Sequence, residues 1–186
     1  RPVAGDARLG AEVATLAAAC VWGGAAGAVD RAAIACEITA MRARIEHEHG
    51  RGGGELKAGR GGLIDIEFAA QALQLGVGAA HPALHTPQTV AALEAAARLG
   101  IADAGDCALL VDGYTFLRRL EHRMRIVHDR SVQRLPEGGQ DLELLARRVG
   151  FPDGVTLRAS FARWTDEIRA AYQRVLASLD PSPTEG

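Results

Sequence analysis

The sequence predicts an all-α fold, an antiparallel helical bundle of about six to seven helices. Three observations support this prediction. Aromatic residues make up only 4% of the chain, while alanine and leucine are abundant, a composition that favours helices over strands. Apolar residues recur at helical spacing, and short loops rich in glycine or proline separate these segments. No segment shows a convincing strand pattern or an internal repeat.

The first two helices are predicted from an N-cap and an apolar stripe each. The first runs from about Asp6 to about Val21, and the second from near Asp30 into the polar run Glu46 to His49. The stripe of the first is Leu9, Val13, Leu16 and Cys20, and that of the second is Ile34, Ile38, Met41 and Ile45.

The middle of the chain predicts a glycine-rich loop, Gly50 to Gly54, and two helices. The third helix begins around Gly62 and fades at Gly76 and Gly78; its inward residues are predicted to be Ile64, Phe68 and Leu75. After a loop, His81 to His85, Thr86-Pro87 predicts an N-cap with proline in the first turn. This fourth helix ends near Leu99, with Gly100 as a left-handed cap.

The C-terminal part predicts three further helices, over about Asp106–His128, Asp141–Val149 and Asp153–Leu179. The apolar stripe of the first is Leu110, Tyr114, Leu117, Leu120 or Glu121, Met124 and Val127, and that of the last is Leu157, Phe161, Trp164, Ile168, Tyr172, Val175 and Leu179. Gly150 is the predicted cap of the short one. We expect residues 1–180 to form a single helical domain and residues 181–186 to be a disordered tail. The start at Arg1-Pro2-Val3, without an initiator methionine, suggests a fragment of a larger protein.

Charge and cysteine content exclude several classes of function. The formal net charge is −2, so no general attraction to nucleic acid or to an anionic membrane is expected. No uninterrupted apolar stretch is long enough to span a bilayer. The odd count of three cysteines, none in a Cys-x-x-Cys pair, predicts reduced thiols and a cytoplasmic location.

The segment LKAGRGGLIDIEF, from Leu56 to Phe68, is the first candidate site. Its glycines could let the backbone approach an anion, with Lys57 and Arg60 adding positive charge. The segment follows a helix rather than a strand and fits neither the P-loop nor the dinucleotide pattern, so spacing alone favours a joint between two helices. Asp65 and Glu67 are two residues apart on a predicted helix and therefore point in different directions, which disfavours a catalytic dyad.

Two other groups of residues are candidates for a metal site and for a docking surface. Alternating residues of Glu46 to His49 do not converge on a helix, so a frayed, solvated end is favoured over a metal site, and His81 and His85 are equally weak ligand candidates. No metal site is predicted. The stretch from Phe116 to Arg125 places a basic strip beside an apolar stripe. This strip, with Arg118, Arg119 and His122, is either a salt-bridged surface involving Glu121 or a docking strip for phosphate or an acidic partner.

Taken together, these motifs resemble one family. LKAGRGGLIDIEF is similar to the Lys-x-Gly-x-Gly-Gly-x-x-Asp-x-Glu-Phe segment of the bifunctional glutamine synthetase adenylyltransferase/adenylyl-removing enzymes. YTFLRRLEHRMR from Tyr114, QRLP from Gln133 and LARRVGF from Leu145 follow in the order of that family. Aspartate at position 65 is typical of the C-terminal, adenylylating half of these enzymes. The PII-protein uridylyltransferases are more distant relatives with a similar glycine motif.

The resemblance implies a helical domain that follows a nucleotidyltransferase domain. In the family the latter carries a Gly-Ser motif and an Asp-x-Asp pair that hold Mg²⁺ and ATP, and AMP is transferred to a tyrosine of glutamine synthetase in nitrogen regulation. The implied partners are glutamine synthetase, PII signal proteins and the nucleotidyltransferase domain of the same enzyme. The alternative is a regulatory interaction module that binds PII or glutamine synthetase, or the related domain of a PII uridylyltransferase.

This sequence lacks the catalytic segment of the family and differs from the family motif at two positions. No Gly-Ser…Asp-x-Asp segment is present, so the chain alone is expected to be inactive and to need no cofactor itself. Glu55 stands where the family tends to have aspartate, and Arg60 where proline is frequent. The resemblance implies that Lys57 and the glycine loop lie near the substrate or nucleotide. The implied positions are Lys57, Gly59, Gly61, Gly62, Asp65 and Glu67.

Overall fold

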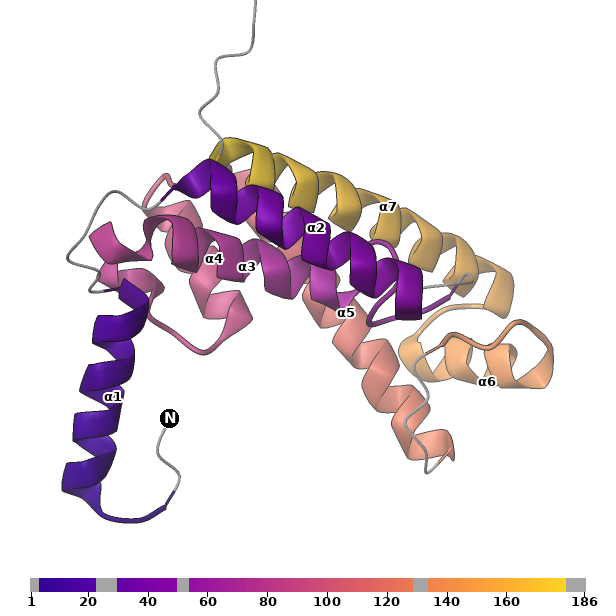
Figure 1. Ribbon diagram of the computed structural model, residues 1–186. Helices are drawn as coiled ribbons and strands as arrows, with labels where there is room; N and C mark the ends of the chain where they lie inside the picture. Colours follow the sequence, from indigo (N-terminus) through magenta and orange to yellow (C-terminus); the bar gives the residue numbers. More distant parts are fainter. Residues whose placement is uncertain (1–3, 23–29, 50–53, 129–133, 180–186) are drawn as a thin grey trace, which may run out of the picture.

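The structure, a computed structural model, describes residues 4–22, 30–49, 54–128 and 134–179, and in these ranges it consists of helices joined by turns and loops, with no strand (Figure 1). The α-helices are α1 (Ala7–Trp22), α2 (Arg31–His49), α3 (Leu63–Val77), α4 (Thr89–Arg98), α5 (Ala104–His128), α6 (Gly139–Val149) and α7 (Gly154–Leu179). Two short 3₁₀ helices, η1 (Gly78–Ala80) and η2 (Pro82–Leu84), join α3 to α4. The predicted all-α bundle of six to seven helices is confirmed. The predicted tail, 181–186, lies outside the described residues.

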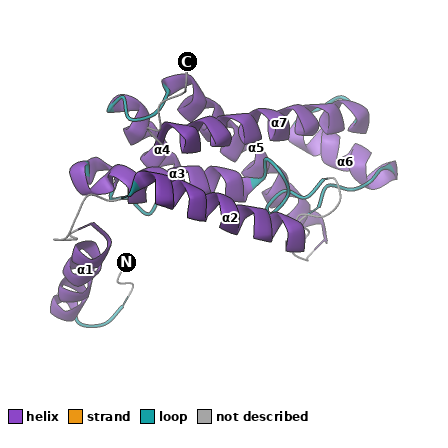
Figure 2. Cartoon of the chain, turned by 45° about the horizontal axis from the view of Figure 1, so that its top comes forward, coloured by secondary structure: helices purple, strands orange, loops and turns teal. Residues whose placement is uncertain are grey.

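Helix α3 is the centre of the bundle and packs against α2, α4, α5 and α7 (Figures 1 and 2). The C-terminal half of α2 contacts the N-terminal end of α3, so these two helices are antiparallel. In contrast, α3 and α7 run parallel: Gly61, just before α3, meets Thr165 of α7, and Gly76 near the end of α3 meets Leu179. The short helix α6 packs against α5 and α7.

The stripes predicted for the two longest helices form much of the core. Helix α5 buries Leu110, Leu117, Leu120 and Met124, and α7 buries Leu157, Phe161, Ile168, Tyr172, Val175 and Leu179. Burying such side chains stabilises a fold by roughly 1.5–3 kcal/mol each. The stretch Leu63–Ala80, although interrupted by Asp65 and Glu67, is apolar and long enough to cross a membrane by length and composition, but 56% of it is buried inside the bundle, as in a core helix.

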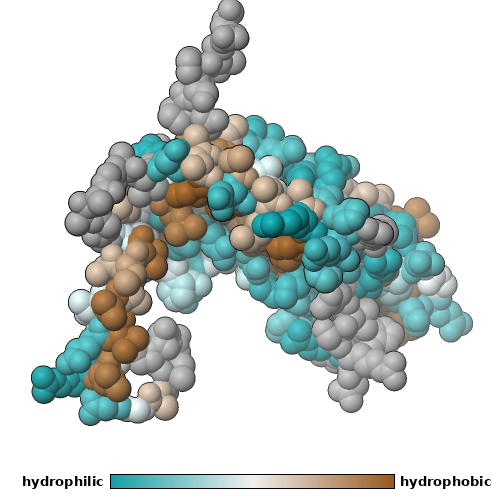
Figure 3. Space-filling model, viewed as in Figure 1, coloured by the Kyte–Doolittle hydropathy of each residue, from teal (hydrophilic) through white to brown (hydrophobic). Residues whose placement is uncertain are grey.

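The stripe predicted to bury α1 is solvent-exposed instead. Leu9, Val13 and Leu16 are 59%, 56% and 66% exposed, and α1 projects from the body of the bundle with this apolar band uncovered (Figures 1 and 3). Among the described residues, α1 is attached at its C-terminal end, where Trp22 stacks on His85 with ring centroids 3.7 Å apart. The periodicity correctly predicted an amphipathic helix, but the bundle provides no surface for its apolar face.

The predicted inward faces of α2 and α3 are right only in part, since Ile38 and Phe68 are half-buried against the core but other members of the two stripes are exposed. On α2, Met41 is exposed and the buried residues are Ala35 and Arg42. On α3, Leu75 is 43% exposed, and the buried face is Leu63, Asp65, Ile66, Ala69, Ala70, Ala72, Leu73, Gly76 and Val77. Because α3 is surrounded by four helices, it buries small and polar residues that periodicity assigns to an outer face.

Most helix ends follow their predicted caps. The carboxylates of Asp6, Asp30 and Asp153 each accept a backbone N–H three residues later, which is N-capping geometry. Asp103, which was not predicted, does the same for α5, so this helix begins at Ala104 rather than near Asp106. Gly100 and Gly150 adopt left-handed φ values of +65° and +90° and end α4 and α6. The predicted start of α4 was wrong: Thr86 accepts the N–H of Gln88, which forms a turn and delays the helix to Thr89.

Candidate functional site

The glycine segment before α3 is a compact set of turns closed on itself. The N–H of Leu63 donates to the carbonyl of Leu56 at 2.9 Å, and that of Gly62 to Gly59 at 2.9 Å. A Cβ on Gly59 would lie 2.5 Å from the Glu55 carbonyl oxygen, and one on Gly62 would lie 2.7 Å from that of Lys57. These glycines are buried and serve close packing of backbone on backbone.

Gly61 is the position in this segment that least tolerates a side chain. Its φ is +68°, and a Cβ there would lie 1.8 Å from the carbonyl oxygen of Thr165 on α7. Only glycine therefore fits where the loop touches α7. The loop is fastened to α7 at a second point, where Arg60 donates to Asp166 at 3.2 Å.

Lys57 and Arg60 are both exposed cations of the loop, but Arg60 is paired with Asp166. The backbone around Lys57 is held by Glu55, whose carboxylate accepts the N–H groups of Lys57 and Ala58 at 3.2 and 3.4 Å. Within the described ranges, no carboxylate or carbonyl pairs with the Lys57 ammonium. The fold thus presents this ammonium to solvent on a backbone that is itself fixed.

Asp65 lies at the centre of a buried ionic cluster. Its side chain is 0% exposed and accepts from Arg42 Nε on α2, from Arg169 Nη1 on α7 at 3.2 Å, and from the N–H of Gly61 at 2.7 Å. Arg42 also donates to the carbonyl of Gly59 at 2.6 Å. Asp65 and Arg42 therefore join α2, α7 and the glycine loop, and we call Arg42, Glu46, Asp65 and Arg169 the Asp65 cluster.

Glu46 completes the charge balance of this cluster. Its Oε2 lies 3.4 Å from Arg42 Nη1 and 3.4 Å from Arg169 Nη2, so two arginines face two carboxylates. Glu46 thus belongs to an ion cluster rather than to a frayed helix end or a metal site. Both carboxylates are already held by guanidinium groups, so the cluster does not fit Mg²⁺, which needs available oxygen ligands. Within the described part of the chain, His, Cys, Asp and Glu form no group of three suited to a metal.

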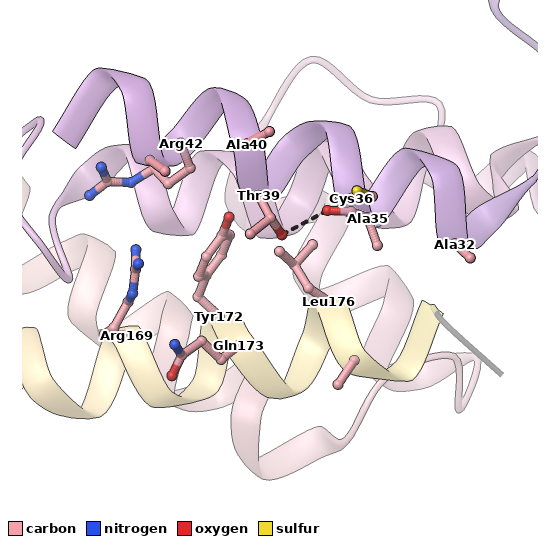
Figure 4. Close-up of a pocket in the computed structure, with 12 residues that line it drawn as sticks. Ala32, Ala35, Cys36, Thr39, Ala40, Arg42, Arg169, Tyr172, Gln173 and Leu176 are labelled. Atoms are coloured by element: carbon pink, nitrogen blue, oxygen red, sulfur yellow. Dashed lines mark hydrogen bonds between the residues drawn. The ribbon is translucent and has the colours of Figure 1, made fainter. Parts of the chain in front are cut away.

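A groove of about 540 Å³ runs between α2 and α7 beside the cluster (Figure 4). One wall consists of small α2 side chains, and Arg169, Tyr172 and Leu176 of α7 form the other. Tyr172 points from α7 toward α2 in Figure 4, and its buried hydroxyl has no hydrogen-bond partner among the described residues. Burial, and secondarily the charge of Asp65, raises the pKa of Tyr172 to about 12.

This pKa predicts a loss of stability at alkaline pH. The pKa of Tyr172 is raised on folding, from 10.0 to about 12, so its contribution is complete below pH 10 and disappears as pH rises from 10 to 12. The linked loss is up to roughly 3 kcal/mol. We expect the free energy of unfolding, measured in urea between pH 9 and 12, to fall more steeply in the native chain than in Tyr172→Phe. Parallel curves for the two chains would contradict this assignment.

Glu67 and Asp65 point apart, as their spacing predicted. Glu67 faces α5 and accepts from Arg118 Nη2 at 3.0 Å. Arg118 also donates to Glu121 at 2.8 Å and to the hydroxyl of Tyr114 at 2.9 Å. Burial opposes the charge on Arg118, but these hydrogen bonds raise its pKa overall. Of the predicted basic strip, Arg118 is thus tied into a salt-bridged network, whereas Arg119 and His122 are exposed.

Three segments that are far apart in the sequence meet at this end of the bundle. The N–H of Leu135 donates to the carbonyl of Gly54 at 2.7 Å, and Glu55 and Arg134 form an antiparallel bridge. The Glu67–Arg118 pair joins α3 to α5. The glycine loop thus pairs with the segment beginning at Arg134, and α3, which follows the loop, is tied to α5.

Sequence reasoning did not identify Arg42 and Arg169 as site residues. Both look like ordinary positions on polar helix faces, and the pairing with Asp65 crosses 23 and 104 residues of sequence. Nothing in the local spacing marks them, because the apolar stripe predicted for α2 consists of Ile34, Ile38, Met41 and Ile45.

Comparison with known proteins agrees with the resemblance of the motifs. The family model described as GlnD PII-uridylyltransferase matches residues 38–178. Relatives named bifunctional glutamine synthetase adenylyltransferase/adenylyl-removing enzyme occur in Streptomyces coelicolor, with 38% identity over 94% of this chain and 18% of the relative, and in Bradyrhizobium diazoefficiens, with 33% identity over 99% and 19%. One from Mycobacterium leprae is 40% identical over 100% of this chain and 20% of its own length.

The chain thus spans about a fifth of the length of the curated relatives that it matches. The similarity covers the glycine loop, α5 and the Arg134 segment together, so the residues that meet at one end of the bundle are also those that carry the resemblance. The chain belongs to the GlnD PII-uridylyltransferase family, and its relatives are bifunctional glutamine synthetase adenylyltransferase/adenylyl-removing enzymes.

Proposed function

We propose that this chain is the helical domain that follows the adenylylating nucleotidyltransferase domain of a cytoplasmic glutamine synthetase adenylyltransferase. In this proposal the neighbouring domain holds Mg²⁺ and ATP and transfers AMP to a tyrosine of glutamine synthetase. The helical domain contributes a preformed surface at the end where the glycine loop, α5 and the Arg134 segment meet. That convergence, with the Lys57 ammonium exposed on a fixed backbone, is the observation that supports the proposal.

The role proposed for Lys57 is electrostatic. Its loop is too closely packed for a phosphate to enter among the glycines, since Gly59 and Gly62 lie against the carbonyls of Glu55 and Lys57. In this proposal the Lys57 ammonium therefore binds an anion from outside the loop. The Asp65 cluster holds the loop through the carbonyl of Gly59 and the N–H of Gly61, and it acts as a positioning element rather than as a catalytic group.

Lys57→Ala in the full-length protein that carries this domain tests the proposal. A hydrogen bond to a charged group contributes about 1.5–3 kcal/mol, so we expect adenylylation of glutamine synthetase to slow by roughly tenfold to a hundredfold. Radiolabelled AMP incorporation measures the rate. Arg44→Ala, an exposed cation on α2, is the control and should leave the rate within about twofold. Unchanged kinetics in Lys57→Ala would reject the proposed role.

A second candidate function is that of an interaction module for PII or for glutamine synthetase itself. The observation that favours it is the exposure of Arg119 and His122 on α5, next to Arg118. The match to the PII-uridylyltransferase family model over residues 38–178 also keeps the related domain of a PII uridylyltransferase as an alternative. Pull-down of the chain with purified glutamine synthetase and purified PII, in separate experiments, distinguishes these candidates.

A further inference from the structure

A basic surface on α5 is not explained by the contacts that hold the bundle together. Arg118, Arg119, His122 and Arg123 line a hollow of about 440 Å³ on the second half of α5. We call this feature the α5 basic hollow. It adds Arg123 to the strip that the sequence suggested.

The four side chains of the hollow are not equivalent. Arg118 is neutralised by Glu67 at 3.0 Å and Glu121 at 2.8 Å, so it forms a wall and supplies little net charge. Arg119, His122 and Arg123 are exposed, and none of them pairs with a carboxylate in the part of the chain that the structure describes. The surplus positive charge of the hollow therefore lies on Arg119 and Arg123, with His122 between them.

The spacing of these two cations defines what they can bind. Arg119 and Arg123 are four residues apart, which is about 6 Å along a helix. Carboxylates at i and i+4 of a helix, or at i and i+2 of an extended segment, have nearly the same separation of about 6–7 Å. Two carboxylates of one short acidic segment can thus pair with both guanidinium groups at once.

A phosphate group fits this surface less well. The hollow lies in the interior of a continuous helix, where backbone N–H groups are used within the helix and cannot turn toward an anion. None of its cations is buried, so no desolvated clamp surrounds a compact anion. Nucleic acid would need a longer track of cations, and the chain has a net charge of −2.

We propose that the α5 basic hollow is a docking site for an acidic protein segment that carries two carboxylates about 6–7 Å apart. The inference rests on the proposed function only for the identity of the natural partner; binding of an acidic segment is a property of this chain alone. Arg119 and Arg123 provide the attraction, His122 lies between them, and Arg118 is a fixed boundary. Because all the contacts are exposed, the affinity should be modest and should fall with added salt.

The test is fluorescence anisotropy of the 186-residue chain with a fluorescein-labelled hexaglutamate peptide at low ionic strength. Arg119→Glu/Arg123→Glu should weaken binding by about tenfold or more, because two attractions become repulsions. The matched control is Arg44→Glu/Arg98→Glu, which makes the same change in net charge at exposed positions on α2 and α4. It should bind within about threefold of the unmodified chain.

The following binding results would overturn the proposal. No binding at low salt, or an equal loss in both double variants, would show that the hollow makes no specific contact. Stronger competition by tripolyphosphate than by unlabelled hexaglutamate would assign the surface to phosphate instead. Circular dichroism melting of both double variants checks that they are folded. Normal peptide binding together with unchanged adenylylation in Lys57→Ala would reject the proposed function and leave this inference intact.

Discussion

Asp65→Ala should destabilise the chain by about 3–5 kcal/mol, because it leaves two guanidinium groups without their shared buried partner. Arg42 is 1% exposed and Asp65 is 0% exposed, so water cannot replace the lost carboxylate without opening the interface between α2, α3 and α7. The N–H of Gly61 also loses its acceptor. For a domain of this size, the change corresponds to a fall in Tm of roughly 10 °C or more.

Urea denaturation followed by circular dichroism measures this effect. Asp112→Ala is the control, since Asp112 is exposed on α5, and it should change the stability by no more than about 0.5 kcal/mol. Asp65→Asn keeps the shape and some hydrogen bonding, so an intermediate loss is expected. A loss below about 1 kcal/mol in Asp65→Ala would mean that the cluster does not hold the helices together.

Gly61→Ala is expected to have the second largest effect, a loss of about 3 kcal/mol or more. The added methyl group would lie 1.8 Å from the carbonyl oxygen of Thr165, and backbone atoms cannot rotate away as a side chain can. Overpacking typically costs about 1–3 kcal/mol, and a left-handed φ adds roughly 1 kcal/mol for alanine. The loop must therefore separate from α7 or the start of α3 must shift.

Gly100→Ala provides a matched comparison for Gly61→Ala. Gly100 has nearly the same φ, +65°, but a Cβ there would meet nothing within 4 Å. Its replacement should cost only the conformational part, about 1 kcal/mol. Equal stabilities of the two variants in the same urea titration would show that contact with Thr165 imposes no constraint.

The sequence by itself determined the helices and the family. Periodicity with capping residues located the seven α-helices of the described residues, and the stripes of α5 and α7 form much of the core, because long amphipathic helices carry their burial pattern in local spacing. The two left-handed caps, Gly100 and Gly150, were predictable for the same reason. The glycine segment was recognised by its order of residues, although its spacing alone indicated only a joint.

Only the tertiary structure shows what surrounds the candidate residues. Two arginines from distant helices enclose Asp65, and its nearness to a substrate stays a prediction. The stripe of α1 was read as core, yet no part of the described bundle covers it. The physical reason is common to both. Local spacing specifies which faces of a helix differ, whereas burial and ion pairing depend on which other helix lies opposite, and that choice links residues up to 104 positions apart.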